Sequence, residues 1–489
     1  MINDKKLDSI EEIAKTIITK KGAIGDTLFT ILQHFKLGML AGKSGIKKRQ
    51  GFKAGHILNL FILFPFLSLS SVRAFYCSGF STMTRAQKDV LFRLKNNPFN
   101  NWRKLLYLVA QRFKTLSRID CEDEKEPVTC FILDDTIQPK SGKRLEAIGK
   151  VWDHVFHKYR LGIKGLFLSY WDGINTIPLD FSLHNERGKN GKRPYGLSKR
   201  ELKARYRKDR PRKSFGYTRF KELGQSKIEN GLLMIRRALR YGFIPDYVLT
   251  DSWFSTKEFI RKIRSFRNGA IHFAGQVRLD KRKYHYRGRA FSGKELRRHL
   301  KGQIKRSRIH KAYYIEVIAI YPGIGEVKLF FSRFSKRSKW HVLLTTDLTL
   351  SYNKMLKLYN NRWTIEVMFK ELKQYLNLGK CQSNDFDAQI ADTTISLITY
   401  TILSLYKRIA EYMPLGQVFR DCKEQLLEAT LAERLWRLFV SLILSFIQIF
   451  ELDISIEEFL KRLFQTQQGN YIIKQLLSTP PLKSQLQRI

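Results

Sequence analysis

The sequence predicts a mixed α/β domain flanked by two helical regions. Three observations predict this fold class. Between residues 126 and 278, short apolar runs rich in β-branched residues alternate with amphipathic segments. Before residue 125 and after residue 386, apolar residues recur at spacings of three and four. From 279 to 338 the chain is both basic and rich in β-forming residues, which indicates a β-rich insertion.

We therefore expect four regions along the chain. They are a helical region at 1–125, a central α/β domain at 126–278 plus 339–385, a basic β-rich insertion at 279–338, and a helical region at 386–489.

The charge of the chain indicates a polyanionic partner. Lysine and arginine number 89 against 44 aspartates and glutamates, which gives a formal net charge of +45. Such a surplus must be solvated or neutralised, and the commonest large polyanion is nucleic acid. The segments 187–219 and 279–310 are especially basic. A membrane surface is the alternative partner.

The apolar stretch Ile57–Val72 is the best candidate for a membrane segment. It is shorter than the roughly 20 residues that a span needs, and Pro65 interrupts it. We expect a buried helical hairpin here and no membrane partner. The five cysteines form no C-x-x-C pair, and the sequence does not start with a basic segment and an apolar leader. Both features are typical of a protein of the reducing cytoplasm.

Two basic amphipathic helices are predicted on either side of Asn96–Pro98, because Asn-Asn-Pro ends a helix. Such a pair suits DNA binding, although an ordinary solvated face has the same pattern.

The central domain has a recognisable order of elements. Strands are predicted at 128–135, 165–173, 176–185, 246–251 and 270–278, with helices at 226–241 and 255–267. The order is therefore βββ-α-β-α-β.

Aspartates close two of the predicted strands. Asp135 ends the run VTCFILDD, and Asp251 ends DYVLTD. A carboxylate at the end of a buried strand is costly unless it is paired or bound to a metal. Asp134 precedes Asp135, and neighbours on a strand point to opposite faces, so only one of the two can be a ligand.

A long helix is predicted from about 354 to 376. At about 100° per residue, four of its polar residues fall within an arc of roughly 60°. They are Tyr359, Arg362, Glu366 and Lys373. The pattern alone is also compatible with ordinary surface pairs. A separate face is apolar and should be buried, with Leu358, Ile365, Met368, Leu372 and Leu376.

Two strand-end aspartates and Glu366 together indicate a site for hard divalent cations. Mg²⁺ prefers oxygen ligands and is usually held by a few carboxylates with water and phosphate. Two such ions about 3.5–4 Å apart can clamp the attacking and leaving oxygens of a phosphoryl displacement. We expect two Mg²⁺ ions, which Mn²⁺ could replace.

The spacing Y-x2-R-x3-E-x6-K from Tyr359 resembles the signature of DDE transposases of bacterial insertion-sequence family four. The DDT sequence at Asp134–Thr136 and the VLTDSWF segment around Asp251 occur in the order that this family shows. The resemblance implies a ribonuclease-H-like fold in which the third acid follows a β insertion.

The same resemblance implies roles for individual residues. Asp135, Asp251 and Glu366 would be the catalytic metal ligands, with Asp135 favoured over Asp134 because the family's acid precedes a threonine. Contacts to the DNA backbone would come from Tyr359, Arg362 and Lys373. Trp340 would stack on DNA, although a tryptophan at a strand edge is also a common core residue. His154 and His157 have no third ligand, so structural or DNA-facing roles are expected for them.

The activity implied is binding to the terminal inverted repeats of an insertion element, then metal-dependent cleavage and transfer of strands to target DNA. Joining two ends in concert implies a homodimer on DNA, with helices of 386–489 as a candidate surface. The protein would be nucleoid-associated in a bacterial cytoplasm. No Gly-rich phosphate loop is present, so ATP is not expected. The alternatives are a ribonuclease-H-like nuclease or resolvase and an inactive DNA-binding derivative.

Overall fold

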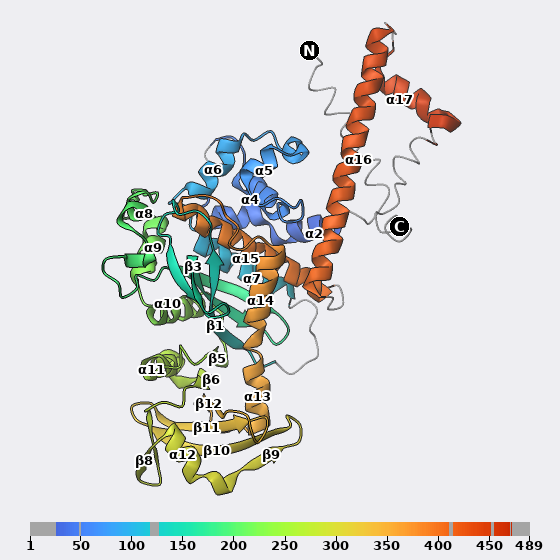
Figure 1. Cartoon of the computed structure of the whole chain (residues 1–489). Helices are drawn as coiled ribbons and strands as arrows, with labels where there is room; N and C mark the ends of the chain where they lie inside the picture. The colour runs from blue at the N-terminus through green and yellow to red at the C-terminus, as the bar shows by residue number, and fades with distance from the viewer. Residues whose placement is uncertain are drawn as a thin grey trace.

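The computed structural model describes residues 26–47, 50–117, 127–409, 414–450, 454–469 and 471 (Figure 1). The outer parts of the predicted terminal regions, 1–25 and 472–489, lie outside the described residues.

The centre of the molecule is a mixed sheet whose strands have the predicted order. The strands β1 (Cys130–Pro139), β3 (Lys158–Trp171) and β4 (Thr176–His184) are antiparallel, and β5 (Tyr247–Thr250) and β6 (His272–Val277) continue the sheet in parallel with β1. The spatial order is β4-β3-β1-β5-β6. Helix α10 (Lys227–Arg240) precedes β5, and α11 (Lys257–Ser265) joins β5 to β6. This mixed α/β arrangement is compatible with a ribonuclease-H-like fold.

One hairpin was not predicted. Strand β2 (Gly149–Asp153) pairs with the first residues of β3, where β3 extends beyond its pairing with β4. The segment is short and largely polar, so it lacks the apolar alternation that identifies a strand in sequence.

The predicted insertion is β-rich and joins the same sheet. Its elements are β7 (Lys283–Tyr286), β8 (Arg289–Ser292), α12 (Gly293–His299), β9 (Lys305–Ser307), β10 (Ala312–Tyr321) and β11 (Gly325–Arg333). Strand β12 (His341–Thr345) lies between β6 and β11 and is antiparallel to both. One sheet of twelve strands therefore runs through the described residues, with the insertion at its far end (Figure 1).

Helices from both ends of the chain cover the central sheet. They are α2 (Asp26–Phe35), α3 (Leu37–Ser44), α4 (Ala54–Leu63), α5 (Val72–Tyr76), α6 (Lys88–Asn96), α7 (Trp102–Ser117) and α15 (Phe386–Ile409). The predicted break at Asn96–Pro98 is confirmed, since it separates α6 from α7. These helices share one hydrophobic core with the sheet.

The stretch Ile57–Val72 is buried, as predicted, but it is not a regular hairpin. Helix α4 ends at Leu63 before Pro65, and the single-turn helix α5 begins only at Val72. Within the described ranges, every helix is too short or too polar to cross a bilayer.

The helices that follow α15 extend away from the body. Helix α16 (Leu415–Ile449) packs on the core at its start and then projects outward (Figure 1). Helix α17 (Ile456–Gln465) folds back on its outer half through a separate small core that contains Val440, Ile443, Ile456 and Leu460.

Candidate active site

The two acid-bearing strands lie side by side in parallel. Leu133 of β1 is opposite Thr250 of β5, so Asp134 and Asp251 directly follow this pair at the carboxyl edge of the sheet. The residues before them are buried and apolar, which fixes the strands in the core. An oxygen of Asp251 also accepts the backbone N–H groups of Trp253 at 3.0 Å and Phe254 at 3.4 Å, which holds the turn after β5.

Asp134 and Asp135 point to opposite faces of the sheet. Asp134 Oδ2 lies 3.2 Å from a guanidinium nitrogen of Arg362. Two residues further, the Thr136 hydroxyl accepts a hydrogen bond of 2.6 Å from Lys373 Nζ. This face therefore meets α14 (Trp363–Tyr375) and the residue before it. Asp135 instead pairs with Lys227 Nζ at 2.5 Å, at the start of α10.

Neighbouring apolar residues agree with this assignment of faces. Phe167 is opposite Asp134 in the β1–β3 register, and its ring centroid lies 5.2 Å from that of Phe369 in α14. Leu133 shares the face of Asp135 and packs against Gly231 of α10. The two aspartates are therefore in different surroundings although they are adjacent in sequence.

Glu366 meets Asp134 through a shared arginine. A guanidinium nitrogen of Arg362 lies 2.7 Å from Glu366 Oε1 and 3.2 Å from Asp134 Oδ2. Arg362 is mostly buried, whereas Glu366 has 36% of its side chain exposed. Arg362 thus places a positive charge between two carboxylates beside Asp251.

Asp134 and Asp251 are buried close to other carboxylates, and the pKa of each is raised. Burial, followed by the charges of Asp251 and Asp135, raises the pKa of Asp134 to about 7. Burial also raises the pKa of Asp251. A cation would relieve this crowding, and the all-oxygen donor set of these carboxylates suits a hard divalent ion. In the described part of the chain, however, no three His, Cys, Asp or Glu side chains lie close enough to hold a metal as they stand.

The predicted helix from 354 to 376 is divided in two. Helix α13 (Tyr352–Asn360) and α14 are separated by a turn in which backbone bonds join residues three apart, including Arg362 N–H to the Tyr359 carbonyl. Residues three apart are aligned in such a turn. Accordingly, the Arg362 guanidinium lies 5.7 Å from the centre of the Tyr359 ring.

The signature side chains turn toward the acid-bearing strands. The Tyr359 hydroxyl donates to the Thr250 carbonyl at 3.4 Å, next to Asp251, and burial raises its pKa to about 12. Arg362 and Lys373 contact β1, as described above. The face predicted to be apolar is buried, with Leu358, Ile365, Met368, Leu372 and Leu376 all less than a tenth exposed.

Trp340 lies apart from the acids. It immediately precedes β12, and the centre of its partly buried ring lies 4.6 Å from the guanidinium group of Arg333 and 5.3 Å from that of Arg297. This environment is cationic, and the structure brings Trp340 into the insertion rather than into the carboxylate cluster.

Lys227 was not predicted from the sequence, and Trp253 was noted only as part of the VLTDSWF segment. Lys227 lies 5.1 Å from the centre of the Trp253 ring as well as pairing with Asp135. Lys227 and Asp135 are 92 residues apart, and no local pattern relates them. The only local signal was Ser226, which caps α10 in a capping box with Glu229 and thereby sets where the helix starts.

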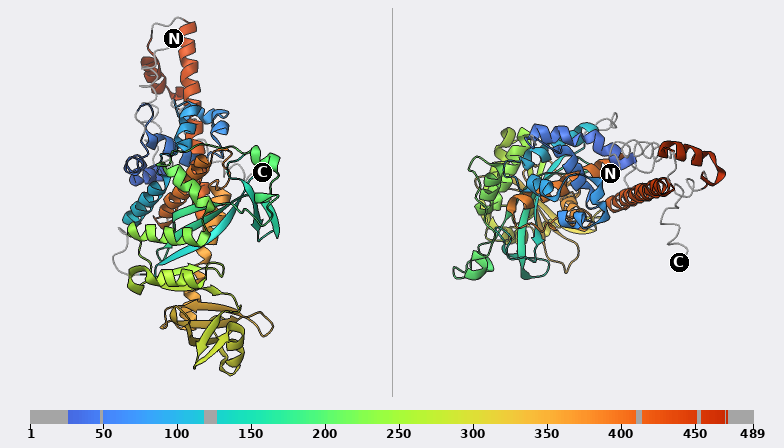
Figure 2. Two further views of the ribbon diagram at one scale, coloured as in Figure 1. Left: turned by 90° about the vertical axis from the view of Figure 1, so that its left-hand side faces the viewer. Right: turned by 90° about the horizontal axis from the view of Figure 1, so that it is seen from above.

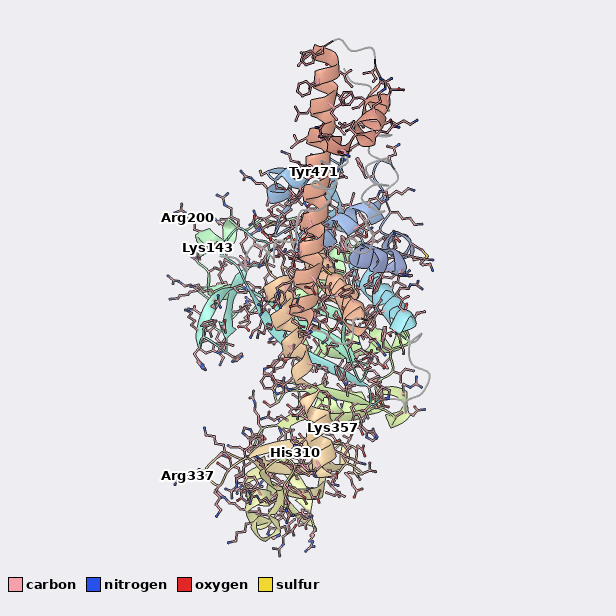
Figure 3. All side chains as sticks on the ribbon, turned by 90° about the vertical axis from the view of Figure 1, so that its right-hand side faces the viewer. Lys143, Arg200, His310, Arg337, Lys357 and Tyr471 are labelled. Carbon is pink, nitrogen blue, oxygen red and sulfur yellow. The ribbon has the colours of Figure 1, made fainter. Side chains whose placement is uncertain are left out.

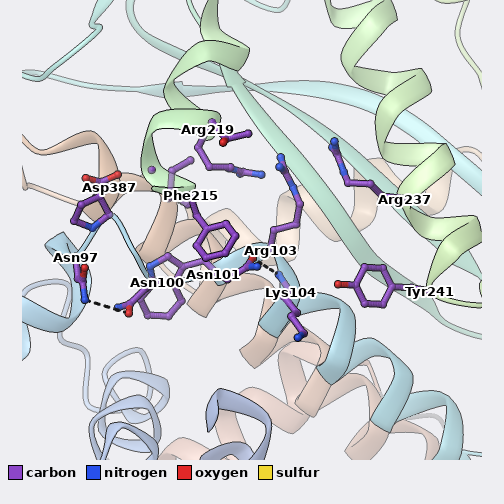
Figure 4. A pocket seen from close by; sticks show the side chains of 15 residues that line it. Asn97, Asn100, Asn101, Arg103, Lys104, Phe215, Arg219, Arg237, Tyr241 and Asp387 are labelled. Carbon is purple, nitrogen blue, oxygen red and sulfur yellow. Dashed lines mark hydrogen bonds between the residues drawn. The ribbon is translucent and has the colours of Figure 1, made fainter. Parts of the chain in front are cut away.

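A pocket of about 230 Å³ lies elsewhere, between α7, α9 (Phe215–Lys221), α10 and α15 (Figure 4). Beside it, the buried Asp180 accepts hydrogen bonds of 2.8 Å from both Arg103 and Arg237. This network joins β4 to two helices. None of the predicted site acids lines the pocket.

Basic side chains occur on several parts of the surface. Figure 3 shows Lys143 and Arg200 on the central body and Arg337 and Lys357 at the insertion. All four are exposed. This spread of charge suits an extended polyanion better than a small anionic ligand.

Two protein families match parts of the chain. Residues 225–402 match the transposase DDE domain, and residues 101–311 match the DDE superfamily endonuclease. The first match includes Asp251 and Glu366, and the second includes both aspartates of β1. No curated protein matches the chain. The two matches support a transposase or endonuclease of the DDE superfamily.

Proposed function

We propose that this chain is a transposase of insertion-sequence family four, which binds the ends of its element, cleaves them and transfers the strands to target DNA. One observation carries the proposal: Arg362 contacts both Asp134 and Glu366 at the sheet edge where Asp251 also lies. A cation of the signature thus links an acid of one strand to an acid of a helix, beside the acid that ends a second strand.

We further propose Asp134, rather than Asp135, as the first acid of the trio. Asp134 shares its face with Arg362, Glu366 and α14, whereas Asp135 is engaged by Lys227 on the face of α10. The order of residues in the family favours Asp135, so variants of both positions are needed.

The residues of the chain have separable roles in this reaction. Asp134, Asp251 and Glu366 would hold divalent ions, Mg²⁺ or Mn²⁺, which neutralise charge on the attacking and leaving oxygens. Arg362 has a planar guanidinium that can pair with a phosphate in a bidentate manner. Tyr359 at the end of α13 and Lys373 on α14 would fix the DNA backbone on either side of it.

A second copy of the chain is the proposed protein partner. The outer half of α16 exposes Leu431, Leu438, Leu442 and Ile449, with exposed fractions of 46, 64, 56 and 72%. Their spacing of seven, four and seven is typical of a coiled-coil seam. The side chains that pack on α17 lie on a different face. Concerted joining of two ends requires two active sites, and this seam would hold them together.

The proposed DNA contacts of the amino-terminal region fall on α6. In α7, Arg103 is committed to Asp180 and Glu222. Arg93 of α6 is 73% exposed and, among the described residues, pairs with Asp89 on the same helix.

Cleavage of labelled DNA from the flanks of the coding sequence tests the proposal. Asp134→Asn, Asp251→Asn and Glu366→Gln should each abolish nicking in Mg²⁺ or Mn²⁺ while duplex binding persists, since binding depends on the cations of the surface. Glu258→Gln, an exposed acid on α11, is the matched control and should remain active. Activity that survives in Asp134→Asn but is lost in Asp135→Asn would reverse the assignment of the first acid.

A ribonuclease-H-like endonuclease is the second candidate, because one of the two family matches is to an endonuclease. Products distinguish the two functions. A transposase joins the cleaved 3′ end to a second DNA molecule, whereas an endonuclease leaves only cut fragments.

A further inference from the structure

The β2–β3 hairpin ends in an apolar tip that the proposed chemistry does not use. Val155 is 81% exposed, Phe156 is 58% exposed and Tyr159 is 64% exposed. Single exposed apolar residues are common on protein surfaces, but the fold does not require two on this turn and a third, Tyr159, on the adjoining strand, where its ring contacts Trp152. In the left view of Figure 2 the hairpin, in teal, projects from the body of the molecule.

The tip has a defined shape. Asp153 Oδ1 accepts the backbone N–H groups of Val155 at 2.9 Å and Phe156 at 3.3 Å. Arg160 then pairs with the other oxygen of Asp153 at 3.2 Å. His157 completes the turn in the left-handed region, with φ of 49°. These contacts hold the apolar side chains outward before any partner binds.

Cations surround the apolar side chains. Arg160 lies 4.9 Å and Lys158 lies 5.8 Å from the centre of the Phe156 ring. From 149 to 160 the only acid is Asp153, which is buried in the turn, and Lys150 adds a third exposed or half-exposed cation. Exposed apolar side chains that are surrounded by cations are better suited to binding DNA than to binding an apolar protein surface.

The hairpin rises from the edge of the sheet that bears the acids. Gly162 is the last residue of β3 to pair with β1, and the tip continues beyond that edge. Asp134 is opposite Phe167, which is eleven positions from Phe156, and this corresponds to at most about 36 Å at about 3.3 Å per residue. The charges of Asp153, which precedes the turn of the hairpin, and of Arg160 act on Lys373 of the signature, whose pKa burial lowers. DNA held at the acids would therefore pass within reach of the tip.

We propose that the tip of the β2–β3 hairpin inserts Phe156 and Val155 between base pairs of the bound duplex, unstacks one step and bends the DNA. Proteins that bend DNA from the minor groove use apolar side chains among cations in this way, with kinks of about 20–90°. Given the length of the hairpin, the unstacked step lies within about one helical turn, about 10 base pairs, of the cleaved phosphate. The inference rests on the proposed function, because the cleaved phosphate defines the position of the step.

The test uses the full chain and a linear duplex from one flank of the coding sequence, with 2-aminopurine placed at successive positions and a dye at each end. Before Mg²⁺ is added, the native protein should raise 2-aminopurine fluorescence at one or two adjacent positions and shorten the distance between the dyes. Phe156→Ser and Val155→Ser should lose most of both signals, and Phe156→Leu should keep them. Val128→Ser, an equally polar change at a half-exposed valine just before β1, is the control and should behave as the native protein.

Two results would overturn the inference. One is a Phe156→Ser protein that unstacks and bends the duplex as the native protein does. The other is a Phe156→Ser protein whose DNA signals persist while its self-association is lost, which would assign the tip to a protein contact. Addition of Mg²⁺ to the same mixtures tests the proposed function separately. A native protein that bends and unstacks the duplex but never cleaves it would refute the nuclease role and leave the role of the tip intact.

Discussion

Replacing Asp134 by asparagine should stabilise the metal-free protein at alkaline pH. The folded chain raises the pKa of this acid from 3.8 to about 7, because the carboxylate is buried near Asp251 and Asp135. Since one pKa unit corresponds to about 1.4 kcal/mol, ionised Asp134 costs the folded state up to about 4 kcal/mol. Only 16% of the side chain is exposed, so water screens little of this cost.

The pH window follows from the direction of the shift. Between about pH 4 and pH 7 the folded state binds more protons at Asp134 than the unfolded state does, so this group lowers stability progressively as pH rises. The destabilisation of the folded state by ionised Asp134 is absent below about pH 4 and complete above about pH 7. Asparagine has no such cost. The advantage of Asp134→Asn should therefore be larger at pH 8 than at pH 5, by up to about 3 kcal/mol, because part of the cost is already present at pH 5.

Urea unfolding at the two pH values, in the presence of a chelator, measures this difference. Asp135→Asn is the matched control, because Asp135 is neutralised by Lys227 and its loss should not stabilise the protein. Saturating Mg²⁺, at about 100 times its dissociation constant, should then stabilise the native protein by about 2.7 kcal/mol and the Asp134→Asn protein by much less. An Asp134→Asn protein that is less stable than the native one at pH 8, or whose advantage is the same at both pH values, would refute the reasoning.

Three further outcomes are expected. Lys373→Gln should reduce the slope of log affinity against log salt by about 0.9, the value of one phosphate contact. An unchanged slope in a filter-binding titration would show that Lys373 does not contact the DNA. Leu438→Glu with Leu442→Glu should abolish mixed-length bands in native electrophoresis of two labelled ends but keep single-end binding, because the start of α16, which belongs to the main core, is unchanged. Asp180→Asn should lower the free energy of unfolding by about 3–5 kcal/mol in urea, because it leaves buried arginines without their main counter-charge, and a loss below about 1 kcal/mol would show that the network relaxes around Glu222.

The sequence alone predicted the order of strands and helices in the central domain. Strands with β-branched apolar runs and helices with one apolar face are local patterns, and each predicts its own element. The same patterns placed Asp251 at the end of a buried strand and separated the polar face of the signature helix from its buried face. Acids at such positions indicate a site because burial without a partner is costly.

Tertiary structure decided what those local patterns left open. The alternation of β1 requires Asp134 and Asp135 to face opposite ways, but which face meets Glu366 depends on the side of the sheet on which α14 packs. Lys227 reaches Asp135 only because α10 covers the other face. The hairpin that carries Phe156 also depended on pairing between residues that are polar in sequence. The periodicity of apolar residues predicts which side of an element is buried. Which neighbour buries that side depends on packing between segments that are far apart in the chain.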